Sequence, residues 1–348
     1  MAADRNLKLT GMAGCIILTL LTLLLFCGAL VCGQVDLPFS TVIDTLFGRN
    51  DDAVTHAIIF EARLPMAITA VCAGASLSVA GLILQTVFRN PLAGPSLLGV
   101  SSGASLGVAL VMMGGASGVL LADASVGSWL IVMCAAIAGA MVVMAILLSF
   151  SSVVRNGVML LIIGVMVSYL TSSIISLLSY IAPSDSLKTF TLWGLGSYSG
   201  VTMSKIPAFA FATLILCLLS IGCIKPLNAF LLGERYASSL GYNVKRTRGV
   251  LLLLSGLLTA VVTAYCGPIG FIGLIVPHLV RMTFRSSNHA IILPASLLMG
   301  AAVSLLCVIL ANGTLSDNAL PINVVTPLIG VPIICYIILQ RNRLPYFK

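Results

Sequence analysis

Charge is scarce in this sequence. Asp, Glu, Lys and Arg make up 8% of the 348 residues, whereas hydrophobic residues make up 59%. Soluble domains carry about 25% charged residues, so the composition excludes an ordinary soluble protein. It predicts an all-α polytopic membrane protein held in a lipid bilayer. The net charge of +8 could suggest nucleic acid, but no basic cluster alternates with aromatic residues, so we expect no nucleic-acid binding.

Several kinds of chemical site are also missing. The ten cysteines show no CxxC spacing and no partnering histidine, which supports neither a zinc site nor a disulfide framework. No GxxxxGK(S/T) motif occurs, so the chain cannot hold ATP in a P-loop. The three histidines, His56, His278 and His289, fall at the edges of the expected membrane spans. We therefore expect that the chain is not an enzyme and binds no metal or cofactor itself.

No Asp, Glu, Lys or Arg falls in the central part of any expected span. Transporters driven by protons or sodium ions usually keep such a group at mid-depth, because the coupling ion needs a ligand there. Its absence favours a pore whose energy source lies on another polypeptide. A secondary transporter or a passive pore remains the alternative of a different class.

The apolar stretches predict ten crossings, since a helical crossing takes about 20 residues. They lie near 10–33, 64–87, 96–114, 128–150, 158–181, 206–224, 249–266, 268–285, 290–311 and 324–341. The interval between Arg248 and Arg281 cannot hold two full crossings, so the eighth helix must run on toward Arg285 or be broken. Short loops leave no room for an extramembranous domain, and we predict one transmembrane domain over residues 1–348.

The positive charges orient these spans. With a cytoplasmic N-terminus, 14 of the 18 Lys and Arg residues lie on the cytoplasmic side, as the positive-inside rule requires. The other four, Arg49, Arg63, Lys188 and Lys205, lie outside. We therefore predict that both termini are cytoplasmic.

The longest inner loop, 225–248, carries an amphipathic pattern. Leu232, Tyr236 and Leu240 recur at i, i+4 and i+8, which predicts one face of a short helix, with Gly241 as its C-terminal cap. Such a helix could lie in the lipid headgroups or insert as a knob into a groove on a soluble partner. The pattern alone leaves both readings open.

Three further segments stand out. Residues 61–66 (EARLPM) open the second span on the outer side, and residues 85–104 (QTVFRNPLAGPSLLGVSSGA) lead into a run of small residues that predicts close helix packing. In residues 267–281 (GPIGFIGLIVPHLVR), Gly267 and Gly270 predict a reversal of the chain. Pro277 predicts a break in the eighth helix.

In their order and spacing, these segments and LGERYASSLGYNVKR resemble the FecCD family of ABC importer permeases. Those proteins are the membrane subunits of importers for ferric siderophores, haem and vitamin B12. The resemblance runs from about Arg63 to the C-terminus. It implies a type II ABC importer permease fold of ten transmembrane helices in the bacterial cytoplasmic (inner) membrane.

The resemblance also implies the partners and the cargo. The permease would act as a homodimer, or with a paralogous permease, together with two cytoplasmic ABC ATPase subunits and an extracytoplasmic substrate-binding protein. ATP and Mg²⁺ would be bound by the ATPase. The expected cargo is a metal chelate, a ferric siderophore in the first instance, and cobalamin, haem and oxyanion permeases share the same motifs.

Roles for single residues follow from the same resemblance. ATPase coupling is expected of Leu232, Gly233, Glu234, Arg235, Tyr236, Leu240 and Gly241. The cytoplasmic gate is expected at Asn90, Leu92, Asn156 and Gly157. A pathway lined by the fifth and tenth helices would include Ser168, Ser172, Thr326 and Gly330. The third motif contributes Gly267, Gly273, Pro277, His278 and Arg281, with His278 in a structural role.

Docking of the binding protein is expected at Arg63, where the sequence also departs from the family. The usual RLPR reads RLPM here, so Met66 removes a second arginine. The outer loop between the ninth and tenth spans also lacks a basic residue and carries Asn312 and Asp317 instead. Arg63 is therefore expected to act alone, or with Lys188 and Lys205.

Overall fold

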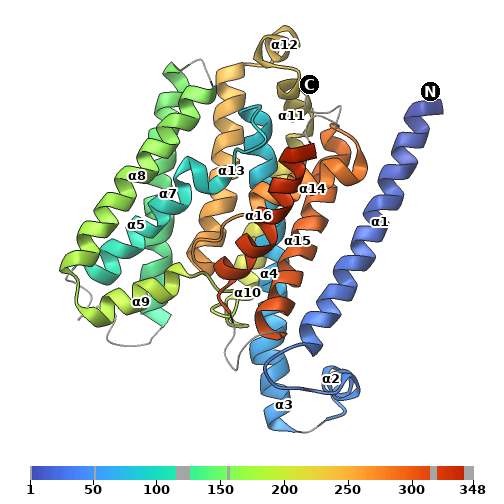
Figure 1. Ribbon diagram of the computed structural model, residues 1–348, viewed down its shortest axis with the longest axis vertical. Coiled ribbons are helices and arrows are strands. Elements are labelled where there is room, and N and C mark those ends of the chain that lie inside the picture. The colour runs from blue at the N-terminus through green and yellow to red at the C-terminus, as the bar shows by residue number, and fades with distance from the viewer. Residues whose placement is uncertain (1, 51, 115–125, 155–156, 314–319, 341–348) are drawn as a thin grey trace. The chain divides into compact units, whose positions relative to one another are not determined.

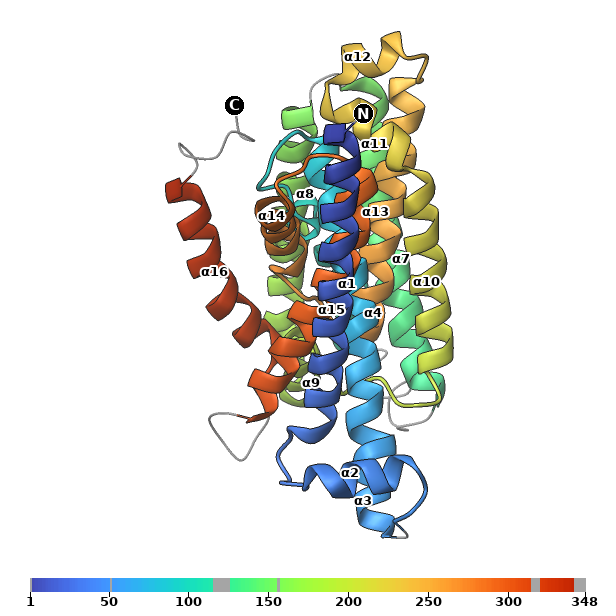
Figure 2. The same ribbon diagram turned by 90° about the vertical axis from the view of Figure 1, so that its right-hand side faces the viewer.

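The computed structural model describes residues 2–50, 52–114, 126–154, 157–313 and 320–340. Every regular element within these ranges is a helix, as Figures 1 and 2 show. The predicted all-α class is confirmed.

Ten helices cover the ten predicted spans. They are α1 (Ala2–Val31), α4 (Leu64–Val87), α5 (Val100–Met113), α7 (Val126–Val153), α8 (Gly157–Ile181), α10 (Ile206–Gly222), α13 (Val244–Cys266), α14 (Ile272–Phe284), α15 (His289–Gly313) and α16 (Ile322–Gln340). Shorter helices lie in the connections: α2 (Phe39–Leu46), α3 (Ala53–Ala57), the π-helix η1 (Ile58–Arg63), the 3₁₀-helix η2 (Pro95–Leu98), α9 (Ser184–Gly194), α11 (Ile224–Leu231) and α12 (Glu234–Ser239).

Not all of these helices are long enough to cross a bilayer alone. Within the described residues, six stretches pass by length and composition, and a seventh passes if α10 and α11, bent by 55°, form one span. Val100–Met113, Ile272–Phe284 and Ile322–Tyr336 are apolar but shorter. The 13 residues of α14 reach about 20 Å, against a hydrocarbon core of about 30 Å. Ten full crossings therefore remain a prediction.

The chain forms two compact units, each assembled from separated segments. Unit 1 comprises Met1–Ser78, Ser197–Leu214 and Gly270–Lys348. Unit 2 comprises Val79–Gly196 and Ile215–Ile269. Two of the boundaries fall inside helices, one in α4 and one in α10.

Small residues let helices of unit 2 approach closely, as the run after residue 98 predicted. A Cβ on Gly103 would lie 2.6 Å from the Gly139 carbonyl oxygen, and one on Gly107 would lie 2.0 Å from the Ala135 carbonyl oxygen. Only glycine fits at these positions, because real Cβ atoms do not approach a carbonyl so closely. The prediction of close packing is confirmed for α5 against α7.

Unit 1 uses the same device between α4 and α15. A Cβ on Gly74 would lie 2.2 Å from the Gly300 carbonyl oxygen, and the Ser78 hydroxyl donates to the Ser296 carbonyl at 2.6 Å. Helix α1 also runs beside α15 (Figure 2), and Thr22 donates to the Leu298 carbonyl at 3.3 Å. Helix α15 is thus the centre of this unit.

The predicted break at Pro277 is wrong. Helix α14 continues through Pro277, where the missing N–H removes only the bond to the Gly273 carbonyl. Burial of Ile275, Val276 and Val280 on the same helix stabilises it across this gap.

The predicted reversal after α13 is half right. Gly267 has φ +75°, and a Cβ there would lie 2.5 Å from the Trp193 carbonyl oxygen. Gly270 has no positive φ and open space around it. The left-handed residue is instead Phe271, with φ +68°.

Candidate functional site

The residues predicted to contact a soluble partner lie on and beside helix α12: Tyr236 is in the helix, Leu232 directly follows α11, and Leu240 directly follows α12. Leu232 is 60% exposed, Tyr236 48% and Leu240 55%. Arg235 is also exposed, whereas Ala237 is fully buried. Large apolar side chains normally avoid such exposure unless they meet lipid or a partner. This group of Leu232, Tyr236 and Leu240 is called the α12 face below.

Glycines set the position of α12. Gly233 has φ +112° and separates α12 from α11, while Gly241 has φ +87° and ends the helix. The Tyr242 N–H donates to the Ala237 carbonyl at 3.1 Å, which completes a C-terminal capping motif. Ala237 packs on Phe230 of α11. The helix is therefore shorter than the amphipathic pattern implied, and its buried residue Ala237 packs it against α11.

A buried arginine fixes the start of α12. Arg248, in the second turn of α13, is 3% exposed. Its Nη2 donates to Glu234 Oε1, the first residue of α12, in an ion pair. Its Nη1 donates to the Val154 carbonyl oxygen at 3.0 Å, just after the end of α7. One guanidinium thus contacts two other segments of unit 2.

The predicted gate residues Asn90 and Leu92 form a tight turn after α4. The Asn90 side-chain oxygen accepts the Leu92 N–H at 2.9 Å, and the Asn90 carbonyl accepts the Ala93 N–H at 3.0 Å. The preceding residue, Arg89, is left-handed with φ +47°. Its Nη1 would lie 3.4 Å from a Cβ on Gly233, so this turn contacts the start of α12. Of the other two predicted gate residues, Asn156 lies outside the described residues and Gly157 begins α8.

Arg63 does not have the exposed position that docking requires. It is 4% exposed, and Nη1 donates to the carbonyls of Leu30 at 2.8 Å and Val31 at 2.7 Å. Nη2 donates to the carbonyl of Val35. A cation at these orphan carbonyls caps the C-terminus of α1. A partner's carboxylate would have to displace these bonds, so this geometry gives Arg63 an internal structural role, and its docking role stays a prediction.

The neighbouring π-helix explains how Arg63 reaches α1. Helix η1 ends at Arg63, two residues before Pro65, which has no N–H to donate. A widened π-turn at such a gap redirects side chains. Helical structure therefore begins at Ala53, well before the predicted span from residue 64.

Met66 and Asn312, the two replacements for missing basic residues, meet in unit 1. The Asn312 side-chain N–H₂ donates to Met66 Sδ at 3.6 Å. Asp317 lies outside the described residues. Met66 and Asn312, which stand where relatives carry basic residues, are thus joined by a neutral contact.

The third motif lies mostly in α14. Gly273, Pro277 and His278 are buried in this helix, and His278 is 3% exposed. Arg281 is partly buried in its last turn. No described group of three His, Cys, Asp or Glu side chains could hold a metal ion.

The predicted pathway residues divide between the two units. On α8, Ser172 is exposed and Ser168 is half-buried, because it packs against Gly99. On α16, Thr326 is 2% exposed, and a Cβ on Gly330 would lie 2.1 Å from Ile275 of α14. Gly330 therefore lies against α14 and Thr326 is buried, and the pathway role of both residues stays a prediction. The exposed side of α16 carries Val324, Leu328, Val331 and Tyr336.

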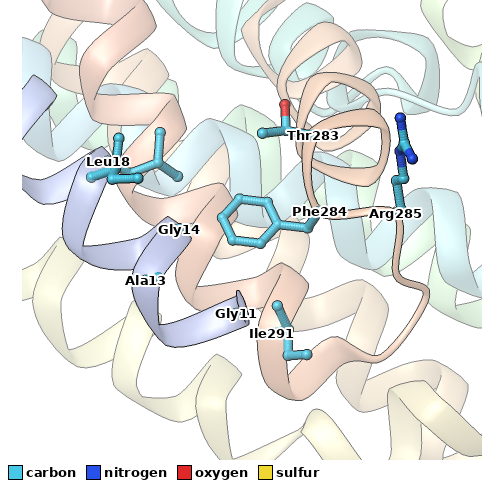
Figure 3. A pocket seen from close by; sticks show the side chains of 9 residues that line it. Gly11, Ala13, Gly14, Leu18, Thr283, Phe284, Arg285 and Ile291 are labelled. Carbon is cyan, nitrogen blue, oxygen red and sulfur yellow. The ribbon is translucent and has the colours of Figure 1, made fainter. Parts of the chain in front are cut away.

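A cavity of about 550 Å³ lies elsewhere, between α1 and the turn from α14 to α15. Figure 3 shows Phe284 pointing toward Gly14, while Arg285 points away from α1. None of the predicted site residues lines this cavity. The wall of the cavity is mainly apolar.

Residues 20–340 match the model of the FecCD transport family. The molybdate import system permease MolB of Haemophilus influenzae is 36% identical over 298 residues, 84% of each chain. The hemin transport permease HmuU of Yersinia pestis is 35% identical over 330 residues, 94% of this chain and 95% of HmuU.

The vitamin B12 import permease BtuC of Escherichia coli is 35% identical over 286 residues, 82% of this chain and 84% of BtuC. A solved structure described as the inward-facing conformation of an ABC transporter of the metal-chelate type aligns with a TM-score of 0.81 and 32% identity. That alignment covers 94% of this chain and 98% of the other. With its helical architecture and matched motifs, the chain belongs to the FecCD transport family of ABC transporter permeases.

Proposed function

We propose that this chain is the permease subunit of an ABC importer that moves a metal chelate across the bacterial inner membrane. The observation that carries the proposal is the α12 face. Three large side chains are exposed on α12 and at its two ends, while Ala237 of α12 is buried against α11. A knob of this form fits a groove on a soluble ATPase.

The proposed cargo is a ferric siderophore, the substrate class that the sequence resemblance put first. The similar permeases named above import molybdate, hemin and vitamin B12, and the similar solved structure is of the metal-chelate type. The exposed side of α8 offers hydroxyl and apolar groups, including Ser172 and Ser173. Such a surface lets a large chelate pass without binding it tightly. Competition between radioactive ferric siderophore and each of the other three compounds distinguishes these cargoes in one uptake assay.

The proposed assembly is a homodimer with two ATPase subunits and an outer binding protein, with both permease termini in the cytoplasm. Because Arg63 is enclosed, the outer positive charges available to the binding protein are Lys188, which is exposed on α9, and Arg49. Arg49 lies 5.8 Å from the centre of the exposed Phe47 ring. A cation beside an aromatic ring is a common element of protein interfaces.

The test is ATP-driven uptake by proteoliposomes that contain the permease, its ATPase and its binding protein. Replacing both Leu232 and Tyr236 by serine should remove the ATPase from the purified complex and abolish uptake. Ser238→Ala, on the exposed side of the same helix, is the matched control and should leave both unchanged. Normal uptake by the double variant, or uptake by the permease alone under a proton gradient, would refute the proposal.

A further inference from the structure

In unit 2, the start of α12 is held from the inner side by Arg248 of α13. Arg248 donates one N–H to Glu234 of α12 and another to the Val154 carbonyl after α7. These two acceptors are separated by 80 residues of sequence. We propose that Arg248 is a positioning residue that links α12 to the end of α7, so that a displacement of α12 by the ATPase moves the start of α8. This inference rests on the proposed role of α12.

The burial of Arg248 makes the link firm. A guanidinium that is 3% exposed needs acceptors in the protein, because it has lost its water. Its planar arrangement of N–H groups fixes the directions of both hydrogen bonds. The Val154 carbonyl directly follows the last residue of α7, at a helix end where a cation is favoured. Moving Glu234 therefore either moves Val154 or breaks a buried charge-assisted bond.

Helix α13 provides the fixed base for this link. The Ser255 hydroxyl of α13 donates to the Ala80 carbonyl of α4 at 3.0 Å. Gly256 of α13 lies so close to Met144 of α7 that a Cβ there would be 1.8 Å from the Met144 methyl group. By contrast, α12 is six residues long and lies between two left-handed glycines, Gly233 and Gly241. The short element is the one that an external partner can displace.

A second contact extends from the same end of α12. Arg89 lies against Gly233, directly before Asn90 and Leu92. Farther along that segment, a Cβ on Gly99 would lie 2.8 Å from Ser168 Oγ of α8. Helix α8 is thus contacted through η2, and it also follows Val154 along the chain. The two sets of contacts converge on the helix that carries Ser168 and Ser172.

The test separates hydrolysis from transport in the complete reconstituted importer. Arg248→Met should keep the ATPase in the complex, because the α12 face is intact, and should keep ATP hydrolysis within about twofold. Uptake per ATP hydrolysed should fall about tenfold. Arg248→Lys, which has one donor group in place of a fork, should give an intermediate ratio. Glu234→Ala, at a partly exposed position, removes only the α12 half and should lower the ratio in a complex that folds.

An exchange of the two charges tests whether transport needs only the Arg248–Glu234 ion pair or also the hydrogen bond from Arg248 to the Val154 carbonyl. Arg248→Glu combined with Glu234→Arg restores the opposite charges, but the new Glu cannot donate to the Val154 carbonyl. Low uptake per ATP in this double variant supports the link, and restored uptake overturns it.

If uptake per ATP hydrolysed is unchanged in both Arg248→Met and Glu234→Ala, the proposed link through Arg248 is overturned. The proposed function is then still intact. Failure of the proposed function has a different result, since the Leu232 and Tyr236 variant would then keep its ATPase.

Discussion

Two buried arginines, one in each compact unit, have the same chemistry and different surroundings. Arg63 of unit 1 donates to three backbone carbonyls at and after the end of α1. Arg248 of unit 2 donates to one carbonyl after α7 and to the carboxylate of Glu234. Arg63 therefore closes a helix end, whereas Arg248 connects a helix end to an exposed helix. The comparison shows that the acceptors around a buried arginine decide whether it closes one helix end or joins separate segments.

The largest expected change in stability is at Arg63. Arg63→Met leaves three carbonyls without their donor and should lower the free energy of unfolding by on the order of 3 kcal/mol. A thiol-reactive dye can follow melting in detergent, because Cys217, Cys266 and Cys307 are buried. Lys188→Met at an exposed site should not shift the melting temperature. If Arg63→Met instead melts normally and loses affinity for the binding protein, Arg63 is a docking residue after all.

Arg248→Met should show a smaller loss of stability, of about 1–3 kcal/mol, because fewer acceptors lose their donor. The Glu234 carboxylate is partly exposed, so water replaces part of its lost bond. The same dye assay measures this change beside Arg63→Met. A larger loss at Arg248 than at Arg63 would reverse the comparison, since the link would then be the more rigid of the two structures.

Gly33→Ala tests how tightly Arg63 is packed without changing Arg63 itself. A Cβ there would lie 2.8 Å from Arg63 Nη2, so the guanidinium must shift, at a cost of about 1 kcal/mol. Gly194→Ala in α9 is the matched control, because nothing lies within 4 Å of its new Cβ. Equal melting temperatures for the two variants would show that the Arg63 site is looser than these distances indicate.

The smallest expected effect is at Asp52, which caps α3 ahead of η1. Its side chain accepts the N–H groups of Val54 and Thr55, and its bond from the Thr55 hydroxyl lowers the pKa of this carboxyl. The lowered pKa means that the cap is present above the ordinary carboxyl pKa and is lost as the pH falls through the lowered value. Asp52→Ala should speed hydrogen exchange at Val54 and Thr55 without changing the melting temperature. Unchanged exchange would show that Asp52 does not cap α3.

The sequence predicted the helical class and the exposure of Leu232, Tyr236 and Leu240, because each depends on local pattern. The single helical face predicted for these three residues is wrong, since Gly233, with φ +112°, separates Leu232 from the helix that carries Tyr236. The close packing of α5 was also predicted from the sequence, since small residues such as Gly let two helices approach closely.

What the sequence did not show are contacts between distant segments. Arg63 was given a docking role by resemblance, and nothing local in the sequence shows that α1 ends beside it. Thr326 and Gly330 were assigned to a pathway by resemblance, although the side of α16 that faces α14 depends on packing. Arg248 looked like one more inner cation, since its partners lie 14 and 94 residues away.

The most direct test of the account is photo-crosslinking from position 236 in the assembled importer. A photoreactive phenylalanine analogue in place of Tyr236 should crosslink to the ATPase, because this side chain is exposed on the α12 face. The same group in place of Lys188 should crosslink to the binding protein and not to the ATPase. No ATPase adduct at position 236, or an ATPase adduct at position 188, would contradict the account.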